Sequence, residues 1–195
     1  VPAPMSPEGV VLLLQWCYVS RNEENHRTLF TDDYQFVFGL LDPEGAPWRT
    51  TPWTREDELA YFDHLVNGGS ANQPPAQSIT LLLDRNFQVI DDPRPGKTPP
   101  WHRVIRTSVT LHIVAENSSR EVSGFANFFL VRGDSAAIPE GLQPRGTIPD
   151  SAFWYIERWE DETLPAEGAR AMPSSAATWG GIKALYRYVS QALTR

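Results

Sequence analysis

The sequence predicts an α+β protein in which helices pack on a strongly curved antiparallel sheet. Three observations predict this class: helical periodicity dominates the start of the chain, long strand-like runs follow it, and the last run carries aromatic residues on both faces. A strand with bulk on both faces is covered on both sides, at least in part. A curved sheet that is covered by helices can enclose a pocket.

The first helix is predicted to begin after Ser6, whose hydroxyl can accept a hydrogen bond from an early backbone N–H, and Pro7 suits the first helical position. Apolar residues then recur at helical spacing: Val10, Leu13, Leu14, Cys17 and Tyr18. A short second helix is expected around 23–29. We expect the first strand to follow it, because Tyr34, Phe36 and Phe38 alternate with more polar positions.

A third helix is predicted after a proline-rich loop at 42–53. Thr54-Arg55-Glu56-Asp57 resembles a capping box with Asp in place of the usual Glu, and Gly68-Gly69 supplies a stop signal. The helix therefore spans about 55–67.

Strands make up most of the remaining domain. Short runs at 79–83 and 87–90 precede two longer ones at 104–115 and 122–131, which flank a polar loop fit for a hairpin. The aromatic run at 153–163 closes the series. Strict alternation along it places Trp154 and Ile156 on one face, and Tyr155 and Trp159 on the other.

The end of the chain is predicted to form a linker at 164–177 and an amphipathic helix at 178–195. One stripe of that helix is apolar: Trp179, Ile182, Tyr186, Val189 and Leu193. Such a stripe must be buried on its own domain, on a partner or on a membrane. We expect it to dock on its own domain.

Composition excludes several classes of function. The chain has 195 residues and a net charge of −7, which argues against binding to nucleic acid or to an anionic membrane surface. Cys17 is the only cysteine, so an intrachain disulfide is impossible, and no apolar run is long enough to span a membrane. The first residue is Val1, which is compatible with removal of an export signal or a tag.

Several segments resemble the nuclear transport factor 2-like superfamily, which includes ketosteroid isomerase and SnoaL-like cyclases. They are Arg21-Asn22, the run from Leu29 to Phe36, Trp53-Thr54-Arg55-Glu56-Asp57-Glu58-Leu59, and the run from Trp154 to Thr163. The resemblance covers residues 6–163 and is greatest to uncharacterised bacterial exported proteins and lipoproteins. It implies a conical half-barrel with three N-terminal helices, a pocket between helices and sheet, a homodimer formed through the sheet, and export from the cytoplasm.

The resemblance does not extend to the catalytic residues of ketosteroid isomerase. The position of its carboxylate base falls on Phe38, the position of its tyrosine falls near Cys17, next to Tyr18, and the position of its protonated acid falls on Asn127. Steroid isomerisation by that route is therefore excluded, and whether the chain is an enzyme stays open.

Our leading hypothesis is the binding of a small apolar or aromatic molecule in an enclosed pocket, without cofactor or metal. The expected wall has the Tyr34/Phe36/Phe38 row facing the Phe125/Asn127/Phe129 row. The Asn127 amide either donates a hydrogen bond to a ligand oxygen or is satisfied within the core by Tyr18 or the backbone. Its members are Tyr18, Tyr34, Phe36, Phe38, Phe62, Phe125, Asn127 and Phe129.

Two alternatives use the same pocket. The first is a cofactor-independent lyase, isomerase or hydrolase, with Asp32, His64, His102 or an acidic residue of the linker as the base near Asn127. The second is a structural, exported scaffold whose pocket is filled by its own side chains. The histidines have no zinc-binding spacing, so a metal site has little support.

Overall fold

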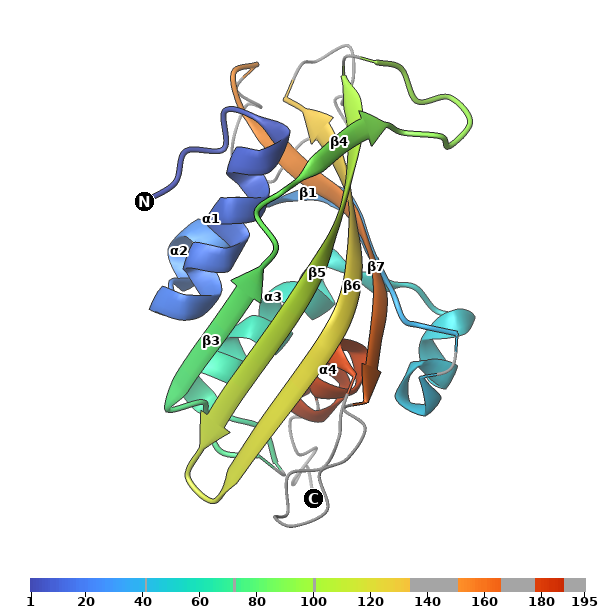
Figure 1. Ribbon diagram of the computed structural model, residues 1–195. Helices are drawn as coiled ribbons and strands as arrows, with labels where there is room; N and C mark the ends of the chain where they lie inside the picture. Colours follow the sequence, from blue (N-terminus) through green and yellow to red (C-terminus); the bar gives the residue numbers. More distant parts are fainter. Residues whose placement is uncertain (41, 72, 100, 134–150, 166–177, 188–195) are drawn as a thin grey trace.

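The computed structural model describes residues 1–40, 42–71, 73–99, 101–133, 151–165 and 178–187 (Figure 1). The irregular segment predicted at 134–150 and most of the predicted linker lie outside these ranges. In chain order the elements are α1 (Pro7–Ser20), α2 (Glu23–Arg27), β1 (Phe30–Val37), η1 (Pro43–Arg49), β2 (Trp53–Thr54), α3 (Arg55–Asp63), η2 (His64–Gly68), β3 (Ser78–Leu83), β4 (Gln88–Asp91), β5 (His102–Ala115), β6 (Ser118–Arg132), β7 (Trp154–Pro165) and α4 (Trp179–Arg187).

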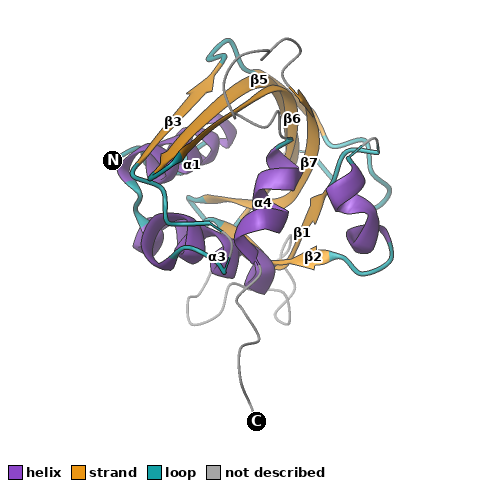
Figure 2. Ribbon diagram, turned by 90° about the horizontal axis from the view of Figure 1, so that it is seen from below, coloured by secondary structure: helices purple, strands orange, loops and turns teal. Residues whose placement is uncertain are grey.

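The strands form one curved sheet in the order β2-β1-β7-β6-β5-β3, with β4 paired to β5. All described pairs are antiparallel except β1–β7, which is parallel. A parallel pair needs a long connection, and most of the chain lies between these two strands. The helices α1, α3 and α4 lie on the concave side of the sheet (Figure 2), so the predicted α+β class and curved sheet are confirmed.

Local signals determine where the helices begin and end. The Ser6 hydroxyl accepts a hydrogen bond from the Gly9 backbone N–H at 3.0 Å, and α1 ends where Arg21 adopts a left-handed conformation with φ of 52°. At α3 the predicted capping box is present: the Thr54 N–H donates to the Asp57 carboxylate at 2.9 Å, and the Thr54 hydroxyl accepts from the Asp57 N–H. These contacts satisfy backbone groups that a helix terminus otherwise leaves unpaired.

The concave face of the sheet carries the core. Alternate residues of five strands point toward the helices and are buried, and aromatic rings dominate the part nearest β1 and β7. Phe36 lies 5.4 Å from Trp159 between ring centroids, and Phe128 lies 5.0 Å from the same Trp159. Aromatic pairs at this spacing add to the stability that burial provides.

A β-bulge in β7 changes which residues share a face. Phe129 pairs with Arg158, whereas Leu130 pairs with Ile156, so Glu157 is an extra residue in the strand. The bulge lets Ile156 and Trp159 both reach the core. The prediction that strict alternation puts these two residues on opposite faces is therefore wrong.

The expected placement of Phe125, Asn127 and Phe129 inside the cone is also wrong. Phe125 is 42% exposed, Asn127 donates to the Glu162 carboxylate at 2.8 Å, and the Arg94 guanidinium lies 4.4 Å from the Phe129 ring centroid. These three side chains lie on the convex face, and the intervening residues of β6 enter the core. Both faces of β6 carry apolar bulk, so alternation alone does not tell which face is inside.

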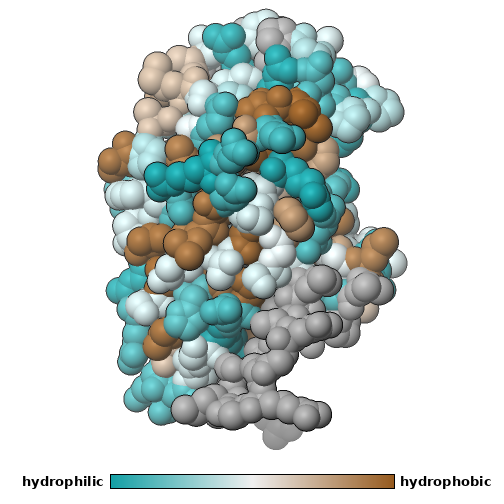
Figure 3. Space-filling model, viewed as in Figure 1, coloured by the Kyte–Doolittle hydropathy of each residue, from teal (hydrophilic) through white to brown (hydrophobic). Residues whose placement is uncertain are grey.

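The convex face has a mixed character (Figure 3), with hydrophilic residues between separate hydrophobic patches. Arg106 pairs with Glu162 at 2.7 Å, and Arg158 pairs with Glu160 at 2.7 Å. The homodimer expected through this sheet stays a prediction, because a single chain does not test it.

Truncation of one phenylalanine on each face of β6 tests the assignment of these faces. We expect Phe128→Ala to lower the free energy of unfolding by about 3–5 kcal/mol, because it leaves a cavity in the core. Phe125→Ala should cost less than about 1 kcal/mol, since its ring is exposed to solvent. Urea denaturation measures both values, and equal losses would contradict the assignment.

Candidate functional site

The hollow of the sheet is occupied by α4 (Figure 2). The helix contacts α3, η1, η2 and β7, and Trp179, Ile182 and Lys183 are completely buried. Trp179 enters between Tyr18 and Trp159, with ring centroids 5.5 and 4.4 Å away. The helix thus docks on its own domain as expected, and the predicted stripe positions 189 and 193 lie outside the described residues.

Side chains of β7 and of Thr178 cap the N-terminus of α4. The Trp179 N–H donates to the Thr163 hydroxyl at 2.8 Å, and the Gly180 N–H donates to the Asp161 carboxylate at 2.8 Å. Thr178 accepts from the Gly181 N–H at 2.8 Å, and its hydroxyl donates to Asp42. Carboxylates at this end of a helix also interact favourably with its dipole.

The helix approaches the segment that follows β1 closely because residue 180 is glycine. A Cβ atom at Gly180 would lie 2.5 Å from a ring carbon of Phe38 and 2.6 Å from a carboxylate oxygen of Asp42. Any larger residue would therefore move the N-terminus of α4 away from its caps.

Deeper in the hollow, Lys183 forms an ion pair with Glu58 of α3, and both side chains are 0% exposed. Glu58 also accepts hydrogen bonds from the Tyr34 hydroxyl at 3.2 Å and from the Trp53 indole N–H at 3.1 Å. Burial lowers the pKa of Lys183 to about 8, against the opposing effect of Glu58.

Aromatic rings surround the Lys183 ammonium group. Its Nζ atom lies 4.4 Å from the Phe36 ring centroid, 4.6 Å from that of Tyr61 and 4.5 Å from that of Trp159. A cation over an aromatic face within about 6 Å is attracted by the ring electrons. We call Phe36, Trp53, Tyr61 and Trp159, together with Glu58, the interior cage.

The structure divides the predicted wall into two groups. Tyr18, Tyr34, Phe36, Phe38 and Phe62 all belong to the buried core inside the cone, where α4 fills the space between sheet and helices. The three residues of β6 lie on the convex face, as described above. Of the eight, Phe38 also lines the pocket described below.

The histidines proposed as bases are engaged away from Asn127. His64 Nδ1 lies 2.7 Å from the Tyr186 carbonyl oxygen, and His102 contacts the backbone of Thr98. His26, in contrast, stacks on Phe62 at 3.8 Å, and burial holds its pKa well below the usual value. His26 is completely buried and is part of the packed core.

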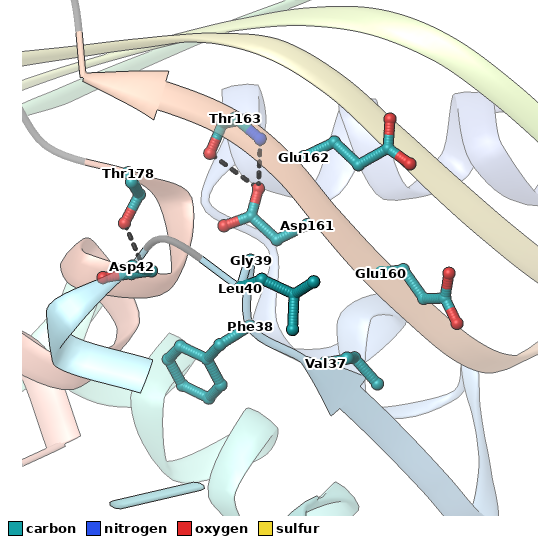
Figure 4. Close-up of a pocket in the computed structure, with 10 residues that line it drawn as sticks. All are labelled: Val37, Phe38, Gly39, Leu40, Asp42, Glu160, Asp161, Glu162, Thr163 and Thr178. Atoms are coloured by element: carbon teal, nitrogen blue, oxygen red, sulfur yellow. Dashed lines mark hydrogen bonds between the residues drawn. The ribbon is translucent and has the colours of Figure 1, made fainter. Parts of the chain in front are cut away.

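A pocket of about 470 Å³ lies at the mouth of the cone, between the end of β1 and β7 (Figure 4). Its apolar wall includes Val37, Phe38 and Leu40, and Leu40 is 86% exposed. Its polar wall consists of Asp42, Glu160, Asp161, Glu162, Thr163 and Thr178. We call it the mouth pocket.

The mouth pocket is acidic. None of the described residues that line it is basic, whereas four of them are Asp or Glu. Burial raises the pKa of Asp161 to about 6, despite hydrogen bonds from Thr163 and Gly180 that favour the ionised form. Arg106 and Asn127 hold the pKa of Glu162 below its usual value.

Metal-binding side-chain groups and membrane-spanning helices were both sought among the described residues. They contain no group of three or more His, Cys, Asp or Glu side chains that could hold a metal ion. None of the described helices is long and apolar enough to cross a membrane.

Solved structures of other proteins share this fold. A structure of a nuclear transport factor 2-like superfamily protein from Salmonella enterica is similar to this chain, with a TM-score of 0.51 and 11% identity over 84% of this chain and 92% of that one. A conserved protein from Planctomyces limnophilus has a TM-score of 0.53 and 14% identity over 80% and 92% of the two chains.

A third similar structure is that of a hexachlorocyclohexane dehydrochlorinase of type 2, with a TM-score of 0.50 and 9% identity over 84% of this chain and 88% of that one. No protein-family model and no curated protein matches the sequence. At these identities the likeness concerns the fold, and the chain has the nuclear transport factor 2-like fold that the sequence resemblance predicted.

Removing one charge of the buried ion pair tests its role in stability. We expect Glu58→Gln to lower the free energy of unfolding by about 3–5 kcal/mol, because Lys183 is left as a buried charge without a partner. The double variant with Lys183→Met removes both charges and should be more stable than Glu58→Gln alone. Urea denaturation of the natural chain, of the two single variants Glu58→Gln and Lys183→Met, and of the double variant measures this, and a double variant that loses the sum of the single losses would contradict it.

The raised pKa of Asp161 predicts a pH dependence of stability. Between pH 3.8 and about 6, Asp161 is ionised in the unfolded chain but protonated in the folded one, so the folded chain binds more protons. Its contribution to stability therefore falls as the pH rises through this window, by an amount on the order of 3 kcal/mol.

Comparison with Asp161→Asn isolates this contribution from those of other carboxyl groups. The stability of the natural chain relative to the variant should decrease between pH 4 and pH 7, as measured by urea denaturation at several pH values. A difference that stays constant or increases with pH would show that the carboxyl group does not titrate in this way.

Proposed function

We propose that the chain binds a small molecule in the mouth pocket, with an apolar body against Val37, Phe38 and Leu40 and a cationic or hydrogen-bond-donating group toward the carboxylates. The observation that supports this most directly is a pocket of about 470 Å³ that combines an apolar wall with an acidic one. Ligand sites generally have volumes of roughly 300–1,000 Å³ and combine apolar surface with a few polar groups.

The chemistry of the polar wall favours one class of ligand. Glu160 and Glu162 are each paired with an arginine of the chain, and Asp161 accepts from Thr163 and Gly180. An ionised carboxylate has about four acceptor sites and only accepts hydrogen bonds, so a further partner from a ligand is a donor such as an ammonium group. The net charge of −7 adds a long-range attraction for cations and disfavours anions. A molecule with one amine and a hydrocarbon or aromatic body meets both conditions.

The bonding of Asp161 favours binding over catalysis at this site. One of its oxygens accepts from the Thr163 hydroxyl at 2.6 Å and from the Thr163 N–H at 3.0 Å, and the other accepts from the Gly180 N–H at 2.8 Å. A carboxylate that caps a helix in this way is held in place with both oxygens occupied by donors of the chain, whereas a general base must be within reach of the proton that it abstracts. The lyase, isomerase or hydrolase alternative therefore has less support than binding.

The interior of the cone supports a second proposal, that of a structural role. Trp179, Ile182 and Lys183 fill the hollow in which the sequence predicted an enclosed ligand. We propose that this part of the fold serves stability, in agreement with the hypothesis of a pocket filled by the chain's own side chains.

A matched pair of surface variants tests ligand binding in the mouth pocket. Leu40→Arg places a cation in the pocket and should weaken binding of an amine by at least about ten-fold, a loss of roughly 1.4 kcal/mol. Leu82→Arg is the control, because Leu82 is also exposed, at 58%, but lies on β3 outside the pocket.

The probes are 2-phenylethylammonium, 2-phenylethanol and 3-phenylpropanoate, titrated by NMR with the amides of Gly39, Leu40 and Thr163 as reporters. We expect the ammonium to bind most tightly and the carboxylate most weakly. Equal binding of all three probes, or equal weakening by the two arginine variants, would contradict the proposal. Native mass spectrometry of the purified chain adds a search for a co-purified ligand.

A further inference from the structure

The mouth pocket follows one edge of β7. Its wall includes the consecutive residues 160–163, and successive side chains of a strand point to opposite faces of the sheet. On the concave side Asp161 caps α4, and on the convex side Glu162 pairs with Arg106. A pocket over one face would meet alternate residues only, so this pocket runs along the edge between the two faces (Figure 4).

Part of this edge has no partner strand in the described part of the chain. The parallel pairing of β1 with β7 ends at Val37 and Glu160, whereas β7 stays paired with β6 to its last residue. After β1 the chain passes the Asp161 carbonyl oxygen at Gly39, where a Cβ atom would lie 3.1 Å from that oxygen. It then enters a turn in which the Asp42 N–H donates to the Gly39 carbonyl oxygen at 3.0 Å.

The backbone donors along this edge are absent or already used. The Asp161 carbonyl faces Gly39, and alternate residues of a strand direct their N–H and C=O groups to the same side, so those of Thr163 point there too. The Thr163 N–H donates to the Asp161 carboxylate at 3.0 Å, and Pro165 has no N–H. The edge therefore does not support a ladder with another strand, which needs donors as well as acceptors.

The polar side chains of the pocket have no proton to offer a ligand. The Thr163 hydroxyl donates to the Asp161 carboxylate at 2.6 Å, and the Thr178 hydroxyl donates to Asp42. The remaining polar side chains among the described lining residues are carboxylates, which only accept hydrogen bonds when they are ionised. Every hydrogen bond between these side chains and a ligand must therefore use a donor of the ligand.

We propose that the cation bound in the mouth pocket is the guanidinium group of a small molecule with an apolar body. This inference rests on the proposed function and specifies its cation. A guanidinium presents five N–H donors in one plane, whereas an alkylammonium presents three around a single nitrogen. The planar group can donate to a carboxylate and to a carbonyl of the strand edge at the same time. Because the edge lacks donors, it favours a small ligand over an extended peptide.

Glu160 has acceptor sites left for such a ligand. It accepts from the Arg158 Nε atom at 2.7 Å, and its side chain is 31% exposed. Since a carboxylate has about four acceptor sites, this contact does not exhaust them. Glu162, in comparison, already accepts from Arg106 and from Asn127. The pairs with Arg158 and Arg106 also show that the carboxylates of this wall are accessible to guanidinium groups.

Three ligands that share one body test the inference: 2-phenylethylguanidinium, 2-phenylethylammonium and N-(2-phenylethyl)urea. The urea has the shape of the guanidinium, but it lacks the charge and carries an acceptor oxygen. We expect the guanidinium to bind about five-fold more tightly than the ammonium, the effect of one additional hydrogen bond, and the urea to bind most weakly. NMR titration with the amides of Gly39, Leu40 and Thr163 as reporters measures this. Binding of the ammonium or the urea that is equal to or tighter than that of the guanidinium would overturn the inference.

A matched pair of variants separates hydrogen bonding from size, because the guanidinium is also larger than the ammonium. Glu160→Gln should reduce the advantage of the guanidinium over the ammonium. Glu121→Gln should leave it unchanged, since Glu121 is an exposed residue of β6 outside the pocket. The same advantage in both variants would show that size sets the preference, and the inference would fail.

The same titrations distinguish this inference from the proposed function. Equal binding of the two cations would leave the proposed function in place and refute the guanidinium alone, whereas no binding of either cation at the reporter amides would refute both. Nα-Acetyl-arginine N-methylamide carries a guanidinium on a peptide unit. If it binds more tightly than 2-phenylethylguanidinium, the assignment to a small molecule is wrong and the ligand is an arginine of a polypeptide.

Discussion

The ion pair between Lys183 and Glu58 is the interaction on which the arrangement of the cone depends. Each charge alone would be costly inside an aromatic core, and together they satisfy one another. The pair joins α3 to a helix that lies 125 residues further along the chain. Because neither side chain is satisfied without the other, the position of α4 in the hollow is specified by charge as well as by the fit of Trp179.

The placement of α4 also creates the mouth pocket. Asp161, Thr163 and Thr178 cap the helix, Asp42 accepts from the Thr178 hydroxyl, and these four residues form part of the polar wall of the pocket. Because residue 180 is glycine, α4 packs directly against the Phe38 ring, which is part of the apolar wall of the pocket. The docking of α4 therefore both fills the interior of the cone and shapes the mouth pocket at the surface.

Much of the fold was predictable from local patterns. The cap of α3 follows from Thr54 and Asp57, and the long hairpin follows from two β-rich runs around a polar loop. The faces of β6 and β7 were not predictable in the same way. Apolar residues occur on both faces of β6, and a single extra residue at Glu157 reverses the alternation in β7.

The candidate site was predictable only in part. Phe38 was expected to line a pocket and does so, although the pocket is at the mouth and not in the interior. Lys183 was missed, because a lysine on an amphipathic helix normally points to solvent. Its position one residue after Ile182 and three before Tyr186, inside the apolar stripe, was the signal that could have identified it.

Aromatic residues on the concave side of this fold do not by themselves reveal whether a ligand binds there. Tyr18, Phe36 and Phe62 would form an equally good wall for a ligand or for a packed helix, since both surfaces bury apolar area in the same way. The polar groups distinguish the two cases. The ion pair of Glu58 with Lys183 is completely buried, whereas the Arg158–Glu160 and Arg106–Glu162 pairs beside the apolar wall around Leu40 are partly exposed to solvent. The distribution of charge, rather than that of aromatic rings, therefore separates the structural part of this molecule from the part that is available for binding.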